Sequence, residues 1–259
     1  MNGPHIHRGS SVPKTFLQKI VALMGPLFFV IFITRGNALL SLVISLLGVS
    51  TAEWLGSYLL KTQSRIGHLE SLYVAILLVV LMPAAVHPAH LFVAAFFMIL
   101  LGREIFGGIG QEPLPVMILP CLCLFPWIRL IDFGSLPLGI GAFVIAAISS
   151  ALLIRNKRLH FLEYAIYVVM ILIPFLFLNH PINFTELYIA IIAAQFIFSD
   201  FSFKQESGLL GWSKALLCGA ITIGMSLTLE LHQAALFSFL TVSIFLECFE
   251  KNNPKLRIS

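Results

Sequence analysis

The Lys and Arg residues of this chain lie almost entirely in alternate connections between apolar segments. With the N-terminus placed inside, 14 of the 16 basic residues fall on the inner side, and only Arg35 and Arg129 fall outside. Membrane proteins carry an excess of Lys and Arg in their cytoplasmic loops, and a crossing helix needs about 20 apolar residues. The pattern predicts ten membrane-spanning helices with both termini in the cytoplasm. The candidate segments are 16–34, 38–60, 69–86, 89–102, 114–128, 136–154, 161–178, 186–199, 212–229 and 232–249.

The composition excludes a soluble domain. Apolar residues make up 59% of the chain and charged residues only 11%, whereas soluble domains have roughly 25% charged residues. We therefore predict an all-α polytopic protein of a bacterial inner (plasma) membrane. Residues 1–259 are expected to form a single transmembrane domain, with 1–15 as a cytoplasmic leader and 250–259 as a cytoplasmic tail. The net charge of +4 is interpreted as loops facing anionic lipid, with no nucleic-acid partner.

A glycine-rich segment follows the fourth apolar stretch. Gly107, Gly108 and Gly110 lie within four positions, and Gln111 and Pro113 come directly after them. Glycine lets the backbone approach a neighbour closely, and proline removes a backbone donor. A helix broken at membrane depth exposes amides and carbonyls that can form a polar site. The alternative interpretation is a tight cytoplasmic turn with close helix packing.

The same segment resembles a known family. Residues 103–111, with the sequence REIFGGIGQ, are similar to a lysine-x-x-phenylalanine-glycine-glycine-x-glycine-glutamine stretch of RnfD and NqrB. RnfD is a membrane subunit of the Rnf ion-translocating electron transport complex, and NqrB is a membrane subunit of the sodium-translocating NADH:quinone reductase. Further stretches resemble the family in the same order: Pro4-His5-Ile6-His7, Glu70-Ser71-Leu72, Phe198-Ser199-Asp200-Phe201, 208–219 and 234–250.

The resemblance implies a fold, a role and a set of contacts. The fold would be two inverted five-helix halves, as in the urea-transporter-like fold. The role would be that of a membrane subunit that couples electron transfer to sodium or proton movement, with other Rnf-type subunits and membrane lipid as partners. The cofactor would be a noncovalent flavin, riboflavin or FMN. Its candidate contacts are Gly107, Gly108, Gly110, Gln111 and Asp200.

The sequence also departs from the family pattern. The serine-glycine-alanine-threonine motif, whose threonine holds FMN covalently in the family, is absent, and the corresponding outer connection is reduced to about 127–136. We therefore expect no covalent FMN. Two alternatives stay open: a small-solute channel or transporter on the same fold, and a scaffold subunit with no cofactor of its own.

Two carboxylates have both a functional and a structural interpretation. Glu53 lies in the second apolar segment, where a carboxylate is expected to face a cavity, pair with a cation or be protonated. Alternatively, it reaches Lys61 or lipid headgroups at the inner boundary. Asp200 either contacts an ion or flavin, or pairs with Lys204 four residues later.

No catalytic residue and no metal site are predicted. Cys121 and Cys123 are two positions apart, so a helix directs them to different sides, and apolar packing is the favoured interpretation. His5 and His7 form a weak metal signal. His87 and His90 are interpreted as interfacial turn residues. The sequence has no Ser-His-Asp pattern, P-loop or dinucleotide fingerprint. We therefore expect the chain to be at most a subunit of a membrane oxidoreductase or translocase complex.

Overall fold

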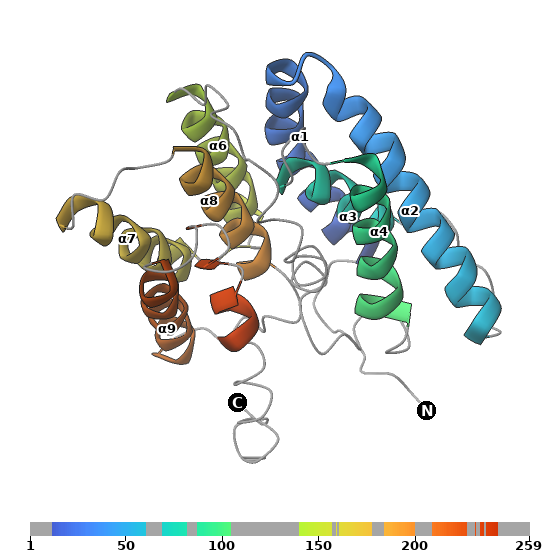
Figure 1. The fold of residues 1–259 in the computed structure, drawn as a ribbon. Coiled ribbons are helices and arrows are strands. Elements are labelled where there is room, and N and C mark those ends of the chain that lie inside the picture. Colours follow the sequence, from blue (N-terminus) through green and yellow to red (C-terminus); the bar gives the residue numbers. More distant parts are fainter. Residues whose placement is uncertain are drawn as a thin grey trace.

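The described part of the chain consists of helices and a few turn residues between them. The computed structural model describes residues 12–60, 69–81, 87–104, 140–156, 159, 161–177, 184–199, 209–226, 231, 234–235 and 237–242. Its elements are α1 (Val12–Ile33), α2 (Asn37–Leu60), α3 (Leu69–Leu81), α4 (Pro88–Ile99), the π-helical turn η1 (Leu100–Glu104), α6 (Ile140–Arg155), α7 (Phe161–Phe177), α8 (Phe184–Phe198) and α9 (Leu209–Ser226) (Figure 1). Helical residues also lie between 231 and 242.

The predicted apolar segments coincide with these helices wherever the structure describes them. The first helix begins four residues before the predicted start at 16, and α7 and α8 end within one residue of their predicted ends. The segment predicted at 114–128 lies outside the described residues, as do residues 82–86 of the third segment. The all-α class is thus confirmed, and the count of ten spans stays a prediction.

Among the described residues, two helices are long and apolar enough to cross a membrane, Lys14–Ile33 and Asn37–Leu59. Many of their exposed side chains are apolar: Phe32 of α1 is 83% exposed, and Leu40, Leu47 and Tyr58 of α2 are also exposed. An exposed apolar surface of this kind is what a helix facing lipid carries. Trp54 and Tyr58 stack at the end of α2 with ring centroids 6.0 Å apart, as aromatic residues do at a membrane interface.

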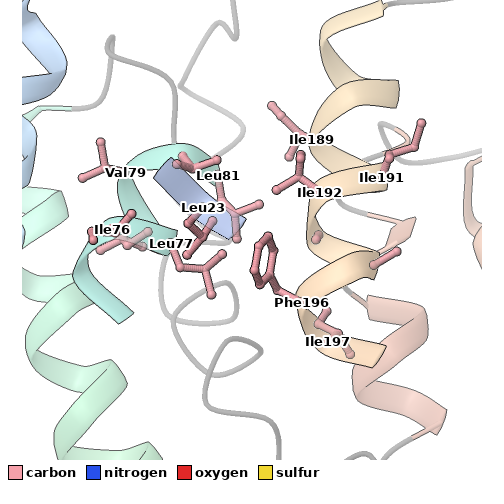
Figure 2. Packing of buried hydrophobic residues seen from close by; sticks show 14 of the residues in the cluster. Leu23, Ile76, Leu77, Val79, Leu81, Ile189, Ile191, Ile192, Phe196 and Ile197 are labelled. Atoms are coloured by element: carbon pink, nitrogen blue, oxygen red, sulfur yellow. The ribbon is translucent and has the colours of Figure 1, made fainter. Parts of the chain in front are cut away.

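The two halves of the chain repeat one pattern of helix pairing. In the first half α1 packs on α3 and α2 packs on α4; in the second half α6 packs on α8 and α7 packs on α9. The halves meet where α1 packs on α6 and α3 touches α8. Figure 2 shows this junction, with Leu23 of α1 and Leu77 and Leu81 of α3 opposite Ile192 and Phe196 of α8. All five of these side chains are buried.

Glycine allows close helix contact in both halves. A Cβ added at Gly48 of α2 would lie 2.7 Å from the carbonyl oxygen of Phe92 on α4, and one added at Gly219 of α9 would lie 2.6 Å from the Cβ of Met170 on α7. Membrane helices associate through such small residues because lipid provides no hydrophobic drive between them. Each half therefore depends on one glycine where its second and fourth helices pack together.

Contacts between α1 and α6 run in opposite order along the two helices. Gly25 lies against Ile145, and Nε2 of Gln18, nearer the start of α1, donates to Oδ1 of Asn156 just after α6 at 3.5 Å. This opposite course agrees with the predicted topology, in which α1 begins and α6 ends on the inner side. Which side is the cytoplasm stays a prediction.

Candidate functional site

Three charged side chains are buried together with polar residues on α1, α2 and α3. Lys19 of α1 is 0% exposed, Glu53 of α2 is 4% exposed and Glu70 of α3 is 3% exposed. The three helices pack on one another. Charged side chains are almost never fully buried unless they are paired, so this group is the strongest candidate site in the described part of the chain. We call Lys19, Glu53, Glu70 and Ser71 the buried charge cluster.

Aromatic rings hold the ammonium group of Lys19. Its Nζ lies 5.6 Å from the ring centroid of Phe16 and 5.2 Å from that of Tyr73 on α3. The two rings are themselves 5.8 Å apart. A cation over an aromatic face gains up to about 2 kcal/mol when it is desolvated, which offsets part of the cost of removing Lys19 from water. The positive charge is thereby fixed at the first turns of α3.

The carboxylate of Glu53 accepts a hydrogen bond from the hydroxyl of Ser71. Ser71 directly follows Glu70, and Glu70 and Tyr73 are one turn apart on α3, so they share a face of that helix. The N-terminal part of α3 therefore places Tyr73 beside Lys19 and Ser71 beside Glu53. Acidic residues are also favoured at a helix N-terminus, where the helix dipole is positive, which helps explain Glu70 there.

The second half contains a neutral hydrogen-bond group. Nε2 of Gln195 on α8 donates to the carbonyl oxygen of Ala146 on α6 and to the hydroxyl of Tyr164 on α7, both at 2.9 Å. One amide thus links three helices. Glu163 of α7 and Lys214 of α9 are also buried, with 8% and 5% exposure.

A third polar group links α7, α9 and the helical residues after 231. Oγ1 of Thr222 lies 2.7 Å from Oγ of Ser238 and 3.4 Å from the hydroxyl of Tyr167. All three side chains are buried, and each hydroxyl has a partner. Interhelical hydrogen bonds of this kind support helix association.

Most of the residues predicted as site residues lie outside the described part. Gly107, Gly108, Gly110, Gln111 and Asp200 all fall there. The described chain reaches this segment through η1, a π-helical turn, and such turns are frequent at functional sites. Glu53 is described and buried, whereas its proposed partner Lys61 lies outside. Its functional role stays a prediction.

Sequence reasoning missed the two buried lysines. Lys19 and Lys214 were counted with the basic residues of the inner side, although both fall within predicted apolar segments. Their position inside a segment was the available signal, because an ionisable residue within a membrane helix is a candidate functional residue. Gln195 gave no such signal, because its amide is not ionisable.

Metal ligands do not gather in the described residues. No group of three or more His, Cys, Asp or Glu side chains there could hold a metal ion. His87 is exposed and lies at the start of α4, where its Nδ1 accepts from the amide of Ala89 at 3.3 Å. The ring centroids of His87 and His90 are 5.7 Å apart. His87 thus lies in the connection before α4, as predicted, whereas His90 lies within α4 and is not a turn residue.

Comparison with known proteins gives one positive result. The sequence matches the model of the NQR2, RnfD, RnfE family over residues 1–251. A search of the curated proteins gives no match.

Proposed function

Because the chain belongs to the NQR2, RnfD, RnfE family, we propose that it is the membrane subunit of an ion-translocating electron transport complex of the Rnf type. The family contains membrane subunits of Rnf- and Nqr-type complexes. The finer proposal is that this chain couples electron transfer to the movement of sodium ions or protons across a bacterial inner membrane. Its partners are the other subunits of the complex.

The buried charge cluster is the observation that carries this proposal. Lys19, Glu53 and Glu70 are nearly inaccessible to solvent, in helices whose residues are mostly apolar. Ionisable residues inside membrane helices are costly, and they commonly mark the path of an ion or proton. A bundle with only a structural task could fill these positions with apolar side chains at no loss of packing. A coupling role explains why the chain retains them.

The repeated helix pairing supports the finer proposal for the fold. Each half pairs its first helix with its third and its second with its fourth. If each half has five helices, an odd number, the second half is inverted across the membrane relative to the first. Two inverted five-helix halves, resembling the urea-transporter-like fold, are therefore proposed. Ion and substrate sites of inverted-repeat transporters lie near the repeat interface, where α1 packs on α6 here.

A noncovalent flavin is the proposed cofactor, and the resemblance to RnfD is its support. Gly107, Gly108, Gly110, Gln111 and Asp200 would hold it. Bound there, a flavin would supply one-electron and two-electron transfer. The visible absorbance of the purified complex tests this proposal, and a denaturation step that releases the colour into the soluble fraction distinguishes noncovalent from covalent attachment.

The test of coupling compares two lysines of α1. Lys19 is fully buried, whereas Lys14 on the same helix is exposed. We expect Lys19→Gln, in the complete complex in sealed vesicles, to reduce ion uptake per electron transferred at least tenfold. Lys14→Gln is the matched control and should leave this ratio unchanged. Full coupling in Lys19→Gln, in a complex that assembles normally, would contradict the proposal.

A small-solute channel on the same fold is the second candidate function. The neutral side chains of Gln195, Tyr164, Thr222 and Ser238 within the second half favour it, because uncharged hydrogen-bonding groups suit a neutral solute. A colourless protein that accelerates solute flux into liposomes without any partner would support the channel. Copurification with partner subunits but without flavin would instead support the scaffold alternative.

A further inference from the structure

We propose that a site between α6 and α8, beside Gln195, binds one small uncharged molecule that both donates and accepts hydrogen bonds. Two buried side-chain atoms have no hydrogen-bond partner there, within the part of the chain that the structure describes. They are Oε1 of Gln195 on α8 and Oγ of Ser149 on α6. Gln195 is 0% exposed and Ser149 is 1% exposed. Buried polar atoms without partners are rare in folded proteins and need an explanation.

The orientation of the Gln195 amide is fixed by its neighbours. Nε2 donates to the carbonyl oxygen of Ala146, which can only accept. Exchanging the amide nitrogen and oxygen would bring Oε1 against that carbonyl oxygen, and two acceptors would face each other. Oε1 is therefore the amide atom that lacks a partner, and it requires a donor.

Two hydroxyl groups belong to the two helices that this amide bonds to, α6 and α7. Ser149 follows Ala146 by three residues on α6, a rise of about 4.5 Å, so its hydroxyl is one helical turn from the carbonyl that binds Gln195. Tyr164 accepts its hydrogen bond from Gln195, which leaves the hydrogen of its own hydroxyl to donate. The group therefore contains one acceptor, Oε1, and two hydroxyls that can donate.

The chemistry of this group selects the ligand. A guest must donate a hydrogen to Oε1 of Gln195 and accept from Ser149 or Tyr164. The three groups that recognise it are all neutral, and the site therefore suits an uncharged guest. Water meets these requirements, and proteins hold about one buried water per 27 residues. A small amide solute has the same chemistry, so the shared class is a neutral hydrogen-bonding molecule of a few atoms.

The sign of the stability change in Ser149→Ala tests the proposal. Removing a buried hydroxyl that has no partner of any kind stabilises a protein, whereas removing one that holds a bound molecule destabilises it. We expect Ser149→Ala to lower the midpoint of thermal unfolding by about 2–4 °C. The matched control is Ser150→Ala, because the hydroxyl of Ser150 already donates to the carbonyl oxygen of Ala147 at 2.8 Å. A midpoint that rises in Ser149→Ala would overturn the proposal.

Acetamide distinguishes the two sources of the ligand. If the site takes a small solute, acetamide should raise the unfolding midpoint of the unmodified protein but not that of Gln195→Met. If the site holds water, acetamide should act equally on both proteins, and a high-resolution density map should show one peak between Gln195 and Ser149. A map without such a peak, together with no acetamide effect, would refute the site. Neither outcome bears on the coupling test at Lys19.

Discussion

The contact between α2 and α4 gives a graded prediction for glycine substitutions. We expect Gly48→Ala to destabilise the protein, because the new Cβ would lie 2.7 Å from the carbonyl oxygen of Phe92 and 2.9 Å from the Cβ of Ala95. Both atoms belong to or adjoin the backbone of α4, so neither can rotate away. Carbon contacts are comfortable at about 3.5–4.0 Å, and the two helices would have to separate by roughly 0.8 Å.

The magnitude follows from two opposing contributions. Overpacking of a filled interior costs about 1–3 kcal/mol. Replacing glycine by alanine in a helix regains about 0.5–1 kcal/mol of conformational entropy. The net expectation for Gly48→Ala is a loss of about 1–2 kcal/mol in the free energy of unfolding. For a chain of this size the unfolding midpoint should fall by roughly 2–8 °C.

Alanine substitutions at two other glycines serve as comparisons for the stability loss expected at Gly48. At Gly25 the new Cβ would lie 3.3 Å from Cγ2 of Ile145, a side-chain methyl, and at Gly224 it would meet nothing within 4 Å. Gly25→Ala should therefore be nearly neutral, and Gly224→Ala should be neutral or slightly stabilising. Thermal unfolding in one detergent, followed by the loss of monodisperse protein, ranks the three variants. If Gly48→Ala proved as stable as Gly224→Ala, the close approach of α2 and α4 would be wrong.

Three further predictions concern hydrogen bonds and sidedness. Ser71→Ala should destabilise the protein by about 1.5–3 kcal/mol, measured by chemical unfolding, because it leaves the buried carboxylate of Glu53 without this donor. Thr222→Val should cost about 1–2 kcal/mol in the same assay by removing bonds to two helices, whereas Thr241→Val, at an exposed hydroxyl, should be neutral. Gly36→Cys and Asn156→Cys should react with an impermeant thiol reagent from opposite sides of the membrane, and labelling from one side would contradict the predicted topology.

The helices could be predicted from the sequence because lipid imposes a simple rule. A segment that crosses a bilayer must satisfy its backbone internally, so runs of apolar residues become helices, and the ends of α2 and α8 follow directly. The turn between α1 and α2 was also predicted from the sequence. Arg35 and Gly36 both have positive φ, and they were predicted to lie in an outer connection.

The buried sites could not be predicted in the same way, because they depend on which helices are neighbours. Nothing in the sequence around Gln195 indicates that its amide meets Ala146 and Tyr164, which are 49 and 31 residues away. The same holds for Lys19, whose ring partner Tyr73 is on a helix that is not adjacent in sequence. Hydropathy reports depth in the membrane, whereas a site is defined by lateral packing.

The positions of the buried charges follow the predicted side of the membrane and do not follow the repeated pattern of helix pairing. Lys19 of α1 and Glu70 of α3 belong to helices that pack together, and so do Glu163 of α7 and Lys214 of α9. The repeat, however, relates α7 and α9 to α2 and α4, so the two sets are not copies of each other. Both sets of buried charges lie toward helix ends that are predicted to be on the inner side. Under the proposed coupling role, we therefore expect the ion to reach these charges from the inner side, and the effect of Lys19→Gln on coupling to depend on the ion concentration there.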